Sequence, residues 1–176
     1  MESTVMIRRA RPEERAAIRD LTLLAYGQFA SIMELSAWTG LRDAVESALS
    51  TDRGGQQIVA ELGGVLVGSV MLFPPSANAY GTLALRIPSP EIRLLAVAPT
   101  ARGLGVARRL VQECMRTARE AGADAIGLHT SPSMRDAIRL YEKFGFTRSP
   151  EYDLHVDGAE PIHAYQLPLV PPRLTD

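Results

Sequence analysis

The spacing of hydrophobic residues alternates along the chain between a helical period and a strand period. Apolar positions that recur every three or four residues predict amphipathic helices, and short apolar runs bounded by turn residues predict strands. In the first part of the chain, this pattern predicts a strand at 5–8, helices at 12–28 and 41–49, and strands at 57–61 and 65–73. Gly63-Gly64 favours a tight hairpin turn between the last two strands.

The second part of the chain repeats the alternation after a long, proline-punctuated connection at 74–90. Glycines follow two of its helices, where a left-handed residue can end a helix: Gly122 and Gly145. The pattern predicts strands at 92–97, 125–128, 152–156 and 163–169, with helices at 104–118 and 133–144. The connection at 74–90 could also hold a short strand at 83–87, which is not counted among these elements. Asp157-Gly158 is expected to join the last two strands.

The order of predicted elements is therefore β-α-α-β-β-β-α-β-α-β-β. Strand–helix–strand units stand beside hairpins in this order, so the sheet is expected to be mixed. A length of 176 residues suits a single domain over 1–176.

Composition and charge narrow the classes of function. The net charge of −1 gives no general electrostatic case for binding nucleic acid or a membrane surface. No apolar run is long enough to span a bilayer, and the first residues lack the features of a signal peptide, so we expect a cytoplasmic protein. The single cysteine, Cys114, lies on the apolar face of a predicted helix and is interpreted as a buried, inert thiol.

The segment 91–110 carries the chemistry that is easiest to interpret. An apolar strand enters a turn with Gly103 and Gly105, and the turn opens a basic amphipathic helix, which favours a phosphorylated ligand. Two rival nucleotide sites fail on their residues. No Lys-Ser or Lys-Thr follows, as a P-loop requires. Arg108 stands where the third glycine of a dinucleotide fingerprint belongs, and no acidic residue ends the next strand.

Two segments of the chain resemble the GNAT superfamily of N-acetyltransferases. Arg102-x-x-Gly105-x-Ala107, after a strand ending in Val97-Ala98-Pro99, is similar to the coenzyme A signature of that family. The run from Ala137 through Tyr141 and Gly145 to Phe146 resembles its A-x-x-L-Y-x-x-x-G-F helix and turn. One departure is Met134, where the family often has Asn, which puts the contact of that Asn with the coenzyme in question.

The resemblance implies an α/β (α+β) fold with a mixed, mostly antiparallel sheet of six to seven strands and about four helices. It also implies acetyl-CoA as acyl donor. Backbone N–H groups of the turn would cradle the pyrophosphate, Arg102, Arg108 and Arg109 would add positive charge, and the Val97 N–H would donate to the developing oxyanion. The residues expected to contact acetyl-CoA are Leu95, Ala96, Val97, Arg102, Gly103, Leu104, Gly105, Val106, Ala107 and Arg108.

Tyr141 is the candidate general acid for the departing thiolate, because a phenol of pKa ~10 can protonate a strong base while remaining un-ionised at neutral pH. Helical spacing alone favours a core residue at Tyr141, and the resemblance to the family is what favours the general acid. Glu91 is the candidate base, directly or through water; an exposed carboxylate or an ion pair with Arg93 is the alternative. Glu34 is a weaker candidate. His129 is interpreted as a structural histidine, and no metal site is predicted.

The acceptor pocket is expected, from the resemblance, in segments 26–40 and 74–90. Its apolar wall would come from Tyr26, Phe29, Met33, Trp38 and Tyr80, although each of these could instead pack between helices. The favoured function is transfer of an acetyl group from acetyl-CoA to a primary amine of a small molecule or a protein, by direct attack in a ternary complex. The alternative is a non-catalytic acyl-CoA-binding sensor. Either a monomer or a homodimer fits the sequence.

Overall fold

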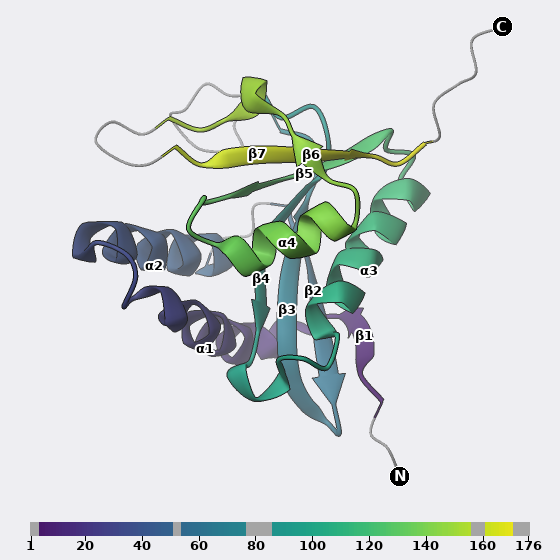
Figure 1. Cartoon of the computed structure of the whole chain (residues 1–176). Helices are drawn as coiled ribbons and strands as arrows, with labels where there is room; N and C mark the ends of the chain where they lie inside the picture. Colours follow the sequence, from purple (N-terminus) through teal and green to yellow (C-terminus); the bar gives the residue numbers. More distant parts are fainter. Residues whose placement is uncertain (1–3, 51–53, 77–85, 156–160, 171–176) are drawn as a thin grey trace, which may run out of the picture. The chain divides into compact units, whose positions relative to one another are not determined.

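A computed structural model describes residues 4–50, 54–76, 86–155 and 161–170 (Figure 1). The contacts within it divide the chain into two compact units, one of Met1–Leu72 with Arg93–Glu113 and one of Phe73–Ile92 with Cys114–Asp176. The helices and strands, in chain order, are β1 (Met6–Arg9), α1 (Arg15–Tyr26), α2 (Leu35–Ser50), β2 (Gln56–Leu62), β3 (Val65–Phe73), β4 (Glu91–Val97), α3 (Val106–Glu120), β5 (Ala125–Thr130), α4 (Arg135–Lys143), β6 (Thr147–Arg148) and β7 (His163–Pro168).

The seven strands hydrogen-bond in the order β1-β2-β3-β4-β5-β7-β6. β4 and β5 pair in parallel, whereas β1 with β2, β2 with β3, β5 with β7 and β6 with β7 pair antiparallel. Together with the four α-helices of the described residues, this confirms the predicted mixed, mostly antiparallel fold. The helices and strands follow the predicted order as far as α4.

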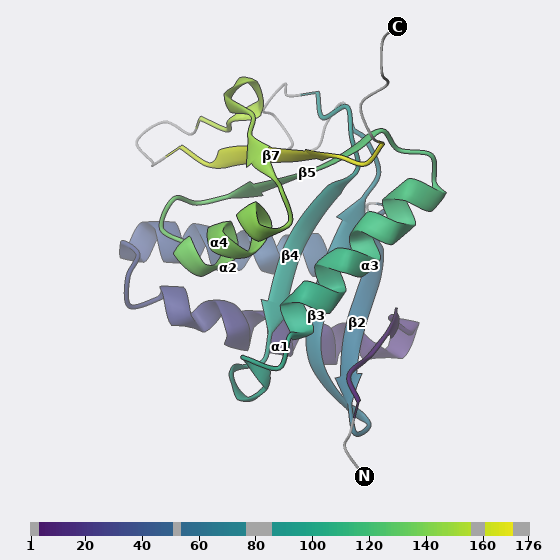
Figure 2. The same ribbon diagram turned by 45° about the vertical axis from the view of Figure 1, so that its right-hand side comes forward.

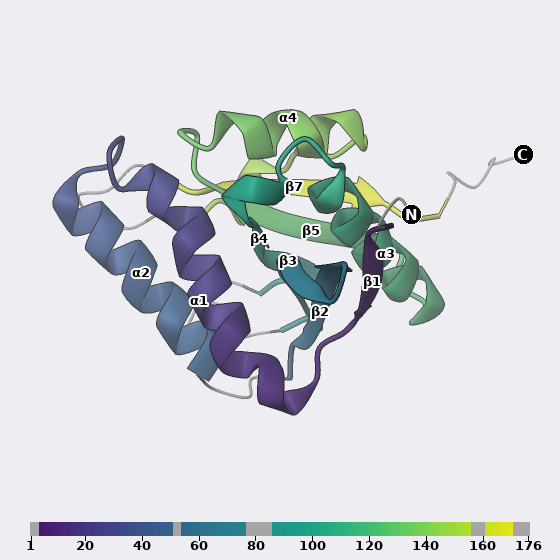
Figure 3. The ribbon, with the colours of Figure 1, turned by 90° about the horizontal axis from the view of Figure 1, so that it is seen from below.

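In the first unit, helices cover both faces of β2 and β3. α1 and α2 lie side by side on one face (Figure 3), and the N-terminal half of α3 crosses the other (Figure 2). The inner face of α1 is fixed by Thr22, whose hydroxyl donates to the Ile18 carbonyl at 2.7 Å and lies 3.3 Å from the Ser69 hydroxyl of β3. Because both hydroxyls are buried, each needs such a partner.

Gly68 of β3 lets the start of α3 approach the sheet. A Cβ atom built on Gly68 would lie 2.7 Å from Val106 Cγ1 and 3.1 Å from the carbonyl oxygen of Ala96. Val106 is the first residue of α3 and is buried. The missing side chain at Gly68 therefore sets the distance between β3 and the helix that follows the glycine turn.

We predict that Gly68→Ala lowers the free energy of unfolding by about 1–3 kcal/mol, because buried Val106 has little room to move. Chemical denaturation measures this change. Gly40→Ala is the matched control: it lies inside α2 with no atom within 4 Å of the added Cβ. It should leave stability unchanged or raise it, since alanine favours helix over glycine. Equal stability of the Gly68 variant and the wild type would contradict the packing argument.

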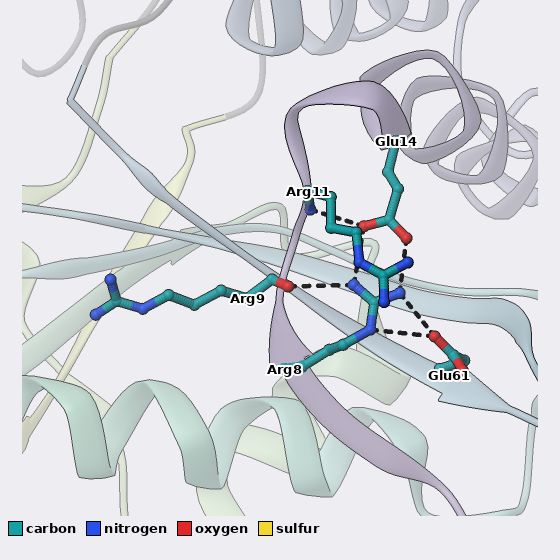
Figure 4. A network of polar contacts seen from close by, with 5 residues as sticks. All are labelled: Arg8, Arg9, Arg11, Glu14 and Glu61. Carbon is teal, nitrogen blue, oxygen red and sulfur yellow. Dashed lines mark hydrogen bonds and ion pairs between the residues drawn. The ribbon is translucent and has the colours of Figure 1, made fainter.

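A network of charged side chains ties the N-terminal strand to its neighbours (Figure 4). The Arg8 guanidinium donates to both carboxylate oxygens of Glu14, at 2.9 and 2.6 Å, and to Glu61 at 3.1 and 2.7 Å. Glu14, in the short 3-10 helix η1 (Pro12–Glu14), also accepts the backbone N–H of Arg11 at 2.7 Å. These bonds lower the pKa of Glu14 to about 2, and Arg8 is the largest cause. Glu61 lies at a register shift of β2 against β3, so the network also holds an irregular point of the sheet.

We predict that Glu14→Gln destabilises the fold by about 1–3 kcal/mol at neutral pH, the usual range for charge-assisted hydrogen bonds. The pKa of Glu14 falls from 4.5 to about 2 on folding, so its contribution is complete above pH 4.5 and disappears as the pH falls toward 2. Denaturation of wild type and variant across that range should show their stabilities converging. Glu13→Gln, an exposed neighbour in the same turn, is the control. A difference that persists unchanged at pH 2 would refute this assignment.

The second unit is built on β5, which pairs with β7 from Ala125 opposite Pro168 to Thr130 opposite His163. The first residue of β4, Glu91, stands opposite Gly127 of β5. A Cβ atom on Gly127 would lie 3.3 Å from the Ser89 hydroxyl, so the lack of a side chain there leaves room beside Glu91. α4 runs alongside β5 and β7 (Figure 3).

Several predicted boundaries were wrong. The second helix begins at Leu35, six residues earlier than predicted, inside the segment that looked irregular. The predicted strand at 152–156 is replaced by the 3-10 helix η4 (Pro150–Tyr152) and an isolated bridge between Leu154 and Ile162, and the strand that pairs with β7 is instead Thr147–Arg148. Pro150 explains the error, because proline favours the first position of a helical turn and lacks the N–H of a strand. Residues 83–85, Val156 and Asp157-Gly158 lie outside the described residues; the neighbouring Ile87 forms a bridge with Ser76.

Candidate functional site

The glycine turn leaves β4 through a series of local backbone bonds. The Ala98 N–H donates to the Val67 carbonyl at 2.9 Å, and the 3-10 helix η3 (Pro99–Ala101) follows. Gly103 and Gly105 then take φ values of 78° and 75°, a region that favours glycine. The Gly105 carbonyl accepts the Arg109 N–H at 3.1 Å, so Gly105 is the residue that caps α3. The turn thus presents the N-terminal end of a 15-residue helix.

The glycine turn is exposed to solvent, whereas the residues on either side of it are packed in the core. Ala101 and Val106, on either side of it, are buried, whereas Leu104 at its tip is 54% exposed. No heavy atom lies within 4 Å of a Cβ position on Gly103 or Gly105, so a ligand can approach the backbone closely at both. The N–H groups of a first helical turn have no partner within the helix, and the helix dipole favours an anion at that point. An open helix N-terminus of this kind suits a phosphate group.

The basic residues around the turn differ in their hydrogen-bond partners. Arg102 is exposed and its guanidinium donates to the Ala25 carbonyl, near the C-terminal end of α1, at 3.5 Å. Arg109 is exposed and donates to the Val5 carbonyl at 3.4 Å, just before the N-terminal strand. Arg108 is exposed as well, so all three arginines stay candidates for phosphate contact.

A strained residue interrupts β4 ahead of the turn. Leu94 has a φ of 52°, and among the described residues it is the only non-glycine with a positive φ. Such a conformation costs of order 1 kcal/mol or more and is found where a strand is re-aimed. The candidate donor-binding residues Leu95, Ala96 and Val97 follow directly, so their backbone direction is set by this distortion.

The residues proposed as an acceptor wall lie on the segment from α1 to α2. Tyr26 is the last residue of α1, and Phe29 is the last residue of the 3-10 helix η2 (Gly27–Phe29). Their rings contact edge to face, with centroids 5.9 Å apart. Tyr26 also packs against a buried cluster of Leu21, Ala25 and Ala96, which brings it beside β4. Burial raises the pKa of Tyr26 to about 12, so its phenol stays protonated at neutral pH and cannot act as a base.

The other members of that wall have less defined surroundings. Met33 and Trp38 are half-buried. The Met33 N–H donates to the Phe29 carbonyl, and the Trp38 N–H donates to the Glu34 carbonyl. Glu34, the weaker candidate base, is exposed. Tyr80 lies outside the described residues.

Glu91, the candidate base, is buried in the second unit and not exposed, which removes the surface-carboxylate alternative. Its side chain is 1% exposed, and its Oε1 atom lies 2.7 Å from His129 Nδ1 on β5. The other ring nitrogen of His129, Nε2, lies 2.7 Å from the carbonyl oxygen of Tyr152. His129 is therefore a satisfied buried histidine, as predicted, but its partner is the candidate base, which the sequence analysis missed.

A second ion pair fixes the loop that carries the Tyr152 carbonyl. Arg148 of β6 makes two 2.7 Å bonds to the two carboxylate oxygens of Asp153, and Asp153 also accepts the Ala164 N–H at 2.8 Å. These contacts lower the pKa of Asp153, with the Arg148 bond as the largest cause. The pair joins β6, the end of η4 and β7, so the backbone that faces His129 is held from three sides.

Tyr141 sits at the end of α4, in a local motif that its sequence encodes. The Phe146 N–H bonds to the Tyr141 carbonyl at 3.1 Å and the Gly145 N–H to the Glu142 carbonyl at 2.9 Å, with Gly145 at φ 92°. This is a Schellman cap, which usually carries a hydrophobic contact between the residues here occupied by Tyr141 and Phe146. Their rings are 5.8 Å apart, edge to face, and Tyr141 is 6% exposed. Tyr141 is thus packed as core and also fixed in place.

Met134, the departure from the family pattern, is the residue that precedes α4. It occupies the N-cap position and provides no side-chain hydrogen bond to the helix. The hydroxyls of Ser131 and Ser133 lie 2.7 Å apart just before it. Within the described residues, no cluster of His, Cys, Asp and Glu could hold a metal ion, and no helix is long and apolar enough to cross a membrane.

Comparison with known proteins identifies the class. Residues 16–146 match the model of the Acetyltransferase (GNAT) family. The chain therefore belongs to the GNAT acetyltransferase family, which confirms the resemblance found in its sequence.

Relatives and solved structures agree with this assignment. The mouse protein named "Probable N-acetyltransferase family 8 member 5" is 33% identical over 132 residues, which are 75% of this chain and 55% of that protein. The chain spans about half the length of the curated relatives it matches. The structure of the histone acetyltransferase HPA2 and related acetyltransferase from Corynebacterium glutamicum has a TM-score of 0.70 at 21% identity, covering 99% of this chain and 100% of that one. A GNAT family acetyltransferase from Brucella melitensis, solved in complex with acetyl-CoA, has a TM-score of 0.62 at 21% identity, covering 96% and 90%. At these identities, the structures establish the fold alone.

Proposed function

We propose that this chain transfers an acetyl group from acetyl-CoA to a primary amine of a small molecule or a protein, by direct attack in a ternary complex. The observation that carries the proposal is the open glycine turn at the start of α3 in a member of the GNAT family. The structure of the Brucella melitensis relative with acetyl-CoA supports the same donor. Bound acetyl-CoA supplies the thioester carbon that the amine attacks.

In this proposal, the glycine turn and the end of β4 bind and orient the donor. The N–H groups of Gly103 to Ala107 hold the pyrophosphate, with charge added by Arg102 and Arg108. The Val97 N–H donates to the carbonyl oxygen as it gains negative charge, a type of interaction often worth about 3 kcal/mol. Tyr26 and Phe29 offer an apolar surface to the acceptor.

Glu91 and Tyr141 move the protons in this proposal. A C–N bond forms to the amine, whose proton passes to Glu91, directly or through water. The C–S bond breaks, and Tyr141 donates its phenolic proton to the departing sulfur. Both protons then exchange with solvent. Burial of Glu91 and the fixed position of Tyr141 support these two roles.

We predict that Gly105→Ala raises the KM for acetyl-CoA, by an amount on the order of tenfold, because a Cβ would intrude where the backbone meets the pyrophosphate. Gly64→Ala is a matched control: Gly64 also has a positive φ, of 84° against 75°, and also has no atom within 4 Å of an added Cβ. The two variants should lose similar stability through backbone strain. An equal change of KM in both would show that strain, not the ligand site, was responsible.

We predict that Tyr141→Phe lowers kcat by up to ~10²–10⁴-fold, the range for a general acid, while the Kd for acetyl-CoA changes little. Steady-state thiol release and a thermal shift with acetyl-CoA measure the two quantities. Because phenylalanine keeps the ring that packs on Phe146, this variant removes only the hydroxyl and leaves the aromatic contact in place. An unchanged kcat would remove Tyr141 from the role of acid.

The function itself is tested with a panel of amines. Thiol release above the background with at least one amine supports the enzyme. Stabilisation by acetyl-CoA without thiol release from any amine would favour the acyl-CoA sensor instead. Absence of stabilisation at a large excess of acetyl-CoA would refute both.

A further inference from the structure

His129 has no role in the proton transfers described so far, although it contacts the candidate base directly. Its side chain is 7% exposed, that of Glu91 is 1% exposed, and the two contacts of the ring are both 2.7 Å long. One contact is to the Glu91 carboxyl and the other is to the Tyr152 carbonyl. The chemistry of these two partners determines where the protons of the ring are.

The proton on Nε2 follows from its partner. A backbone carbonyl oxygen can only accept a hydrogen bond, so a 2.7 Å contact with Tyr152 requires that Nε2 donates. The contact between Nδ1 and Glu91 Oε1 then requires a second proton, since two lone pairs would repel at 2.7 Å. Glu91 and His129 together therefore hold one proton more than a carboxylate and a neutral imidazole would. Their combined charge is zero.

Burial disfavours a net charge on the pair. A lone carboxylate out of water is costly, and it avoids that cost by taking up a proton, which would leave no base. An imidazolium on one side of Glu91 allows the other carboxylate oxygen to remain negative. The fixed Tyr152 carbonyl keeps the imidazolium oriented, because Tyr152 N–H bonds to the Ser149 carbonyl and the adjacent Asp153 is held by Arg148.

We propose that His129 is a positioning residue that, as an imidazolium bonded to Glu91 and to the Tyr152 carbonyl, keeps the buried Glu91 carboxylate ionised and able to accept the proton of the acceptor amine. This inference rests on the proposed function. In the step concerned, the amine N–H bond breaks and an O–H bond forms on Glu91, while His129 keeps both of its protons. The pair returns to zero charge when Glu91 releases that proton to solvent.

Other ionisable groups stand on the elements around the pair. Tyr152 belongs to η4 and Asp153 follows it, Arg148 is on β6 and His163 is on β7. Arg148 and Asp153 bond to each other, and His163 acts electrostatically on Asp153. Arg93 follows Glu91 by two residues along β4. The proposal rests on the direct 2.7 Å contact between His129 Nδ1 and Glu91 Oε1.

The first test reads the protons without any reaction. In the full chain, ¹⁵N chemical shifts of the His129 ring should show both nitrogens protonated at pH 7, and Glu91→Gln should shift His129 to the neutral form. A His129 ring with one protonated nitrogen in the wild type would overturn the inference. Because this measurement needs no acceptor, it separates failure of the inference from failure of the proposed acetyl transfer.

The second test is kinetic and uses His129→Gln, whose amide can still donate a hydrogen bond but carries no charge. We expect kcat/KM for the amine at pH 7 to fall by about 10²-fold. The acidic limb of its pH profile should move up by at least one pH unit, with the KM for acetyl-CoA within twofold of the wild type. His155→Gln, at an exposed histidine, is the matched control. An unchanged pH profile in a folded His129→Gln variant would overturn the inference; if that variant does not fold, the ¹⁵N measurement on the wild type and Glu91→Gln decides.

Discussion

A carboxylate that loses its water at the first residue of an inner strand must regain that stabilisation from the protein. Glu91 does so through His129, which in turn needs the Tyr152 carbonyl at its second nitrogen. That carbonyl is held by the 3-10 turn at Pro150, and the turn is held by the ion pair of Arg148 and Asp153. One connected set of contacts therefore runs from Glu91 through β5 and η4 to β6 and β7.

The first unit meets a different constraint, which concerns the backbone. Gly68 removes a side chain so that Val106 can pack onto β3, and Gly103 and Gly105 adopt left-handed conformations so that the chain can turn from strand to helix. The strained Leu94 lies in the same strand–turn–helix segment. In this unit, the geometry offered to a ligand depends on the residues that have no side chain. In the second unit, it depends on pairs of charged side chains.

Features that depend on neighbouring residues could be predicted from the sequence more readily than features that depend on contacts between distant residues. Features set by neighbours in the chain were found: β3 at its observed bounds, the hairpin at Gly63-Gly64, the glycine turn, and the cap of α4 at Gly145. The early start of α2 and the replacement of the 152–156 strand were missed, because apolar periodicity is weak in the first and Pro150 outweighs it in the second.

The pairing of Glu91 with His129 was missed for another reason: the two residues are 38 positions apart and meet only through the register of β4 on β5. Since Glu91 lies opposite Gly127 in parallel strands, His129 is on the same face of the sheet two residues further along. A parallel pairing of these two strands, once assumed, would have placed them together. Local patterns thus specify the glycine turn, whereas the pairing of Glu91 with His129 needs two strands in register, because a buried ionisable group must find its partner in another element of the fold.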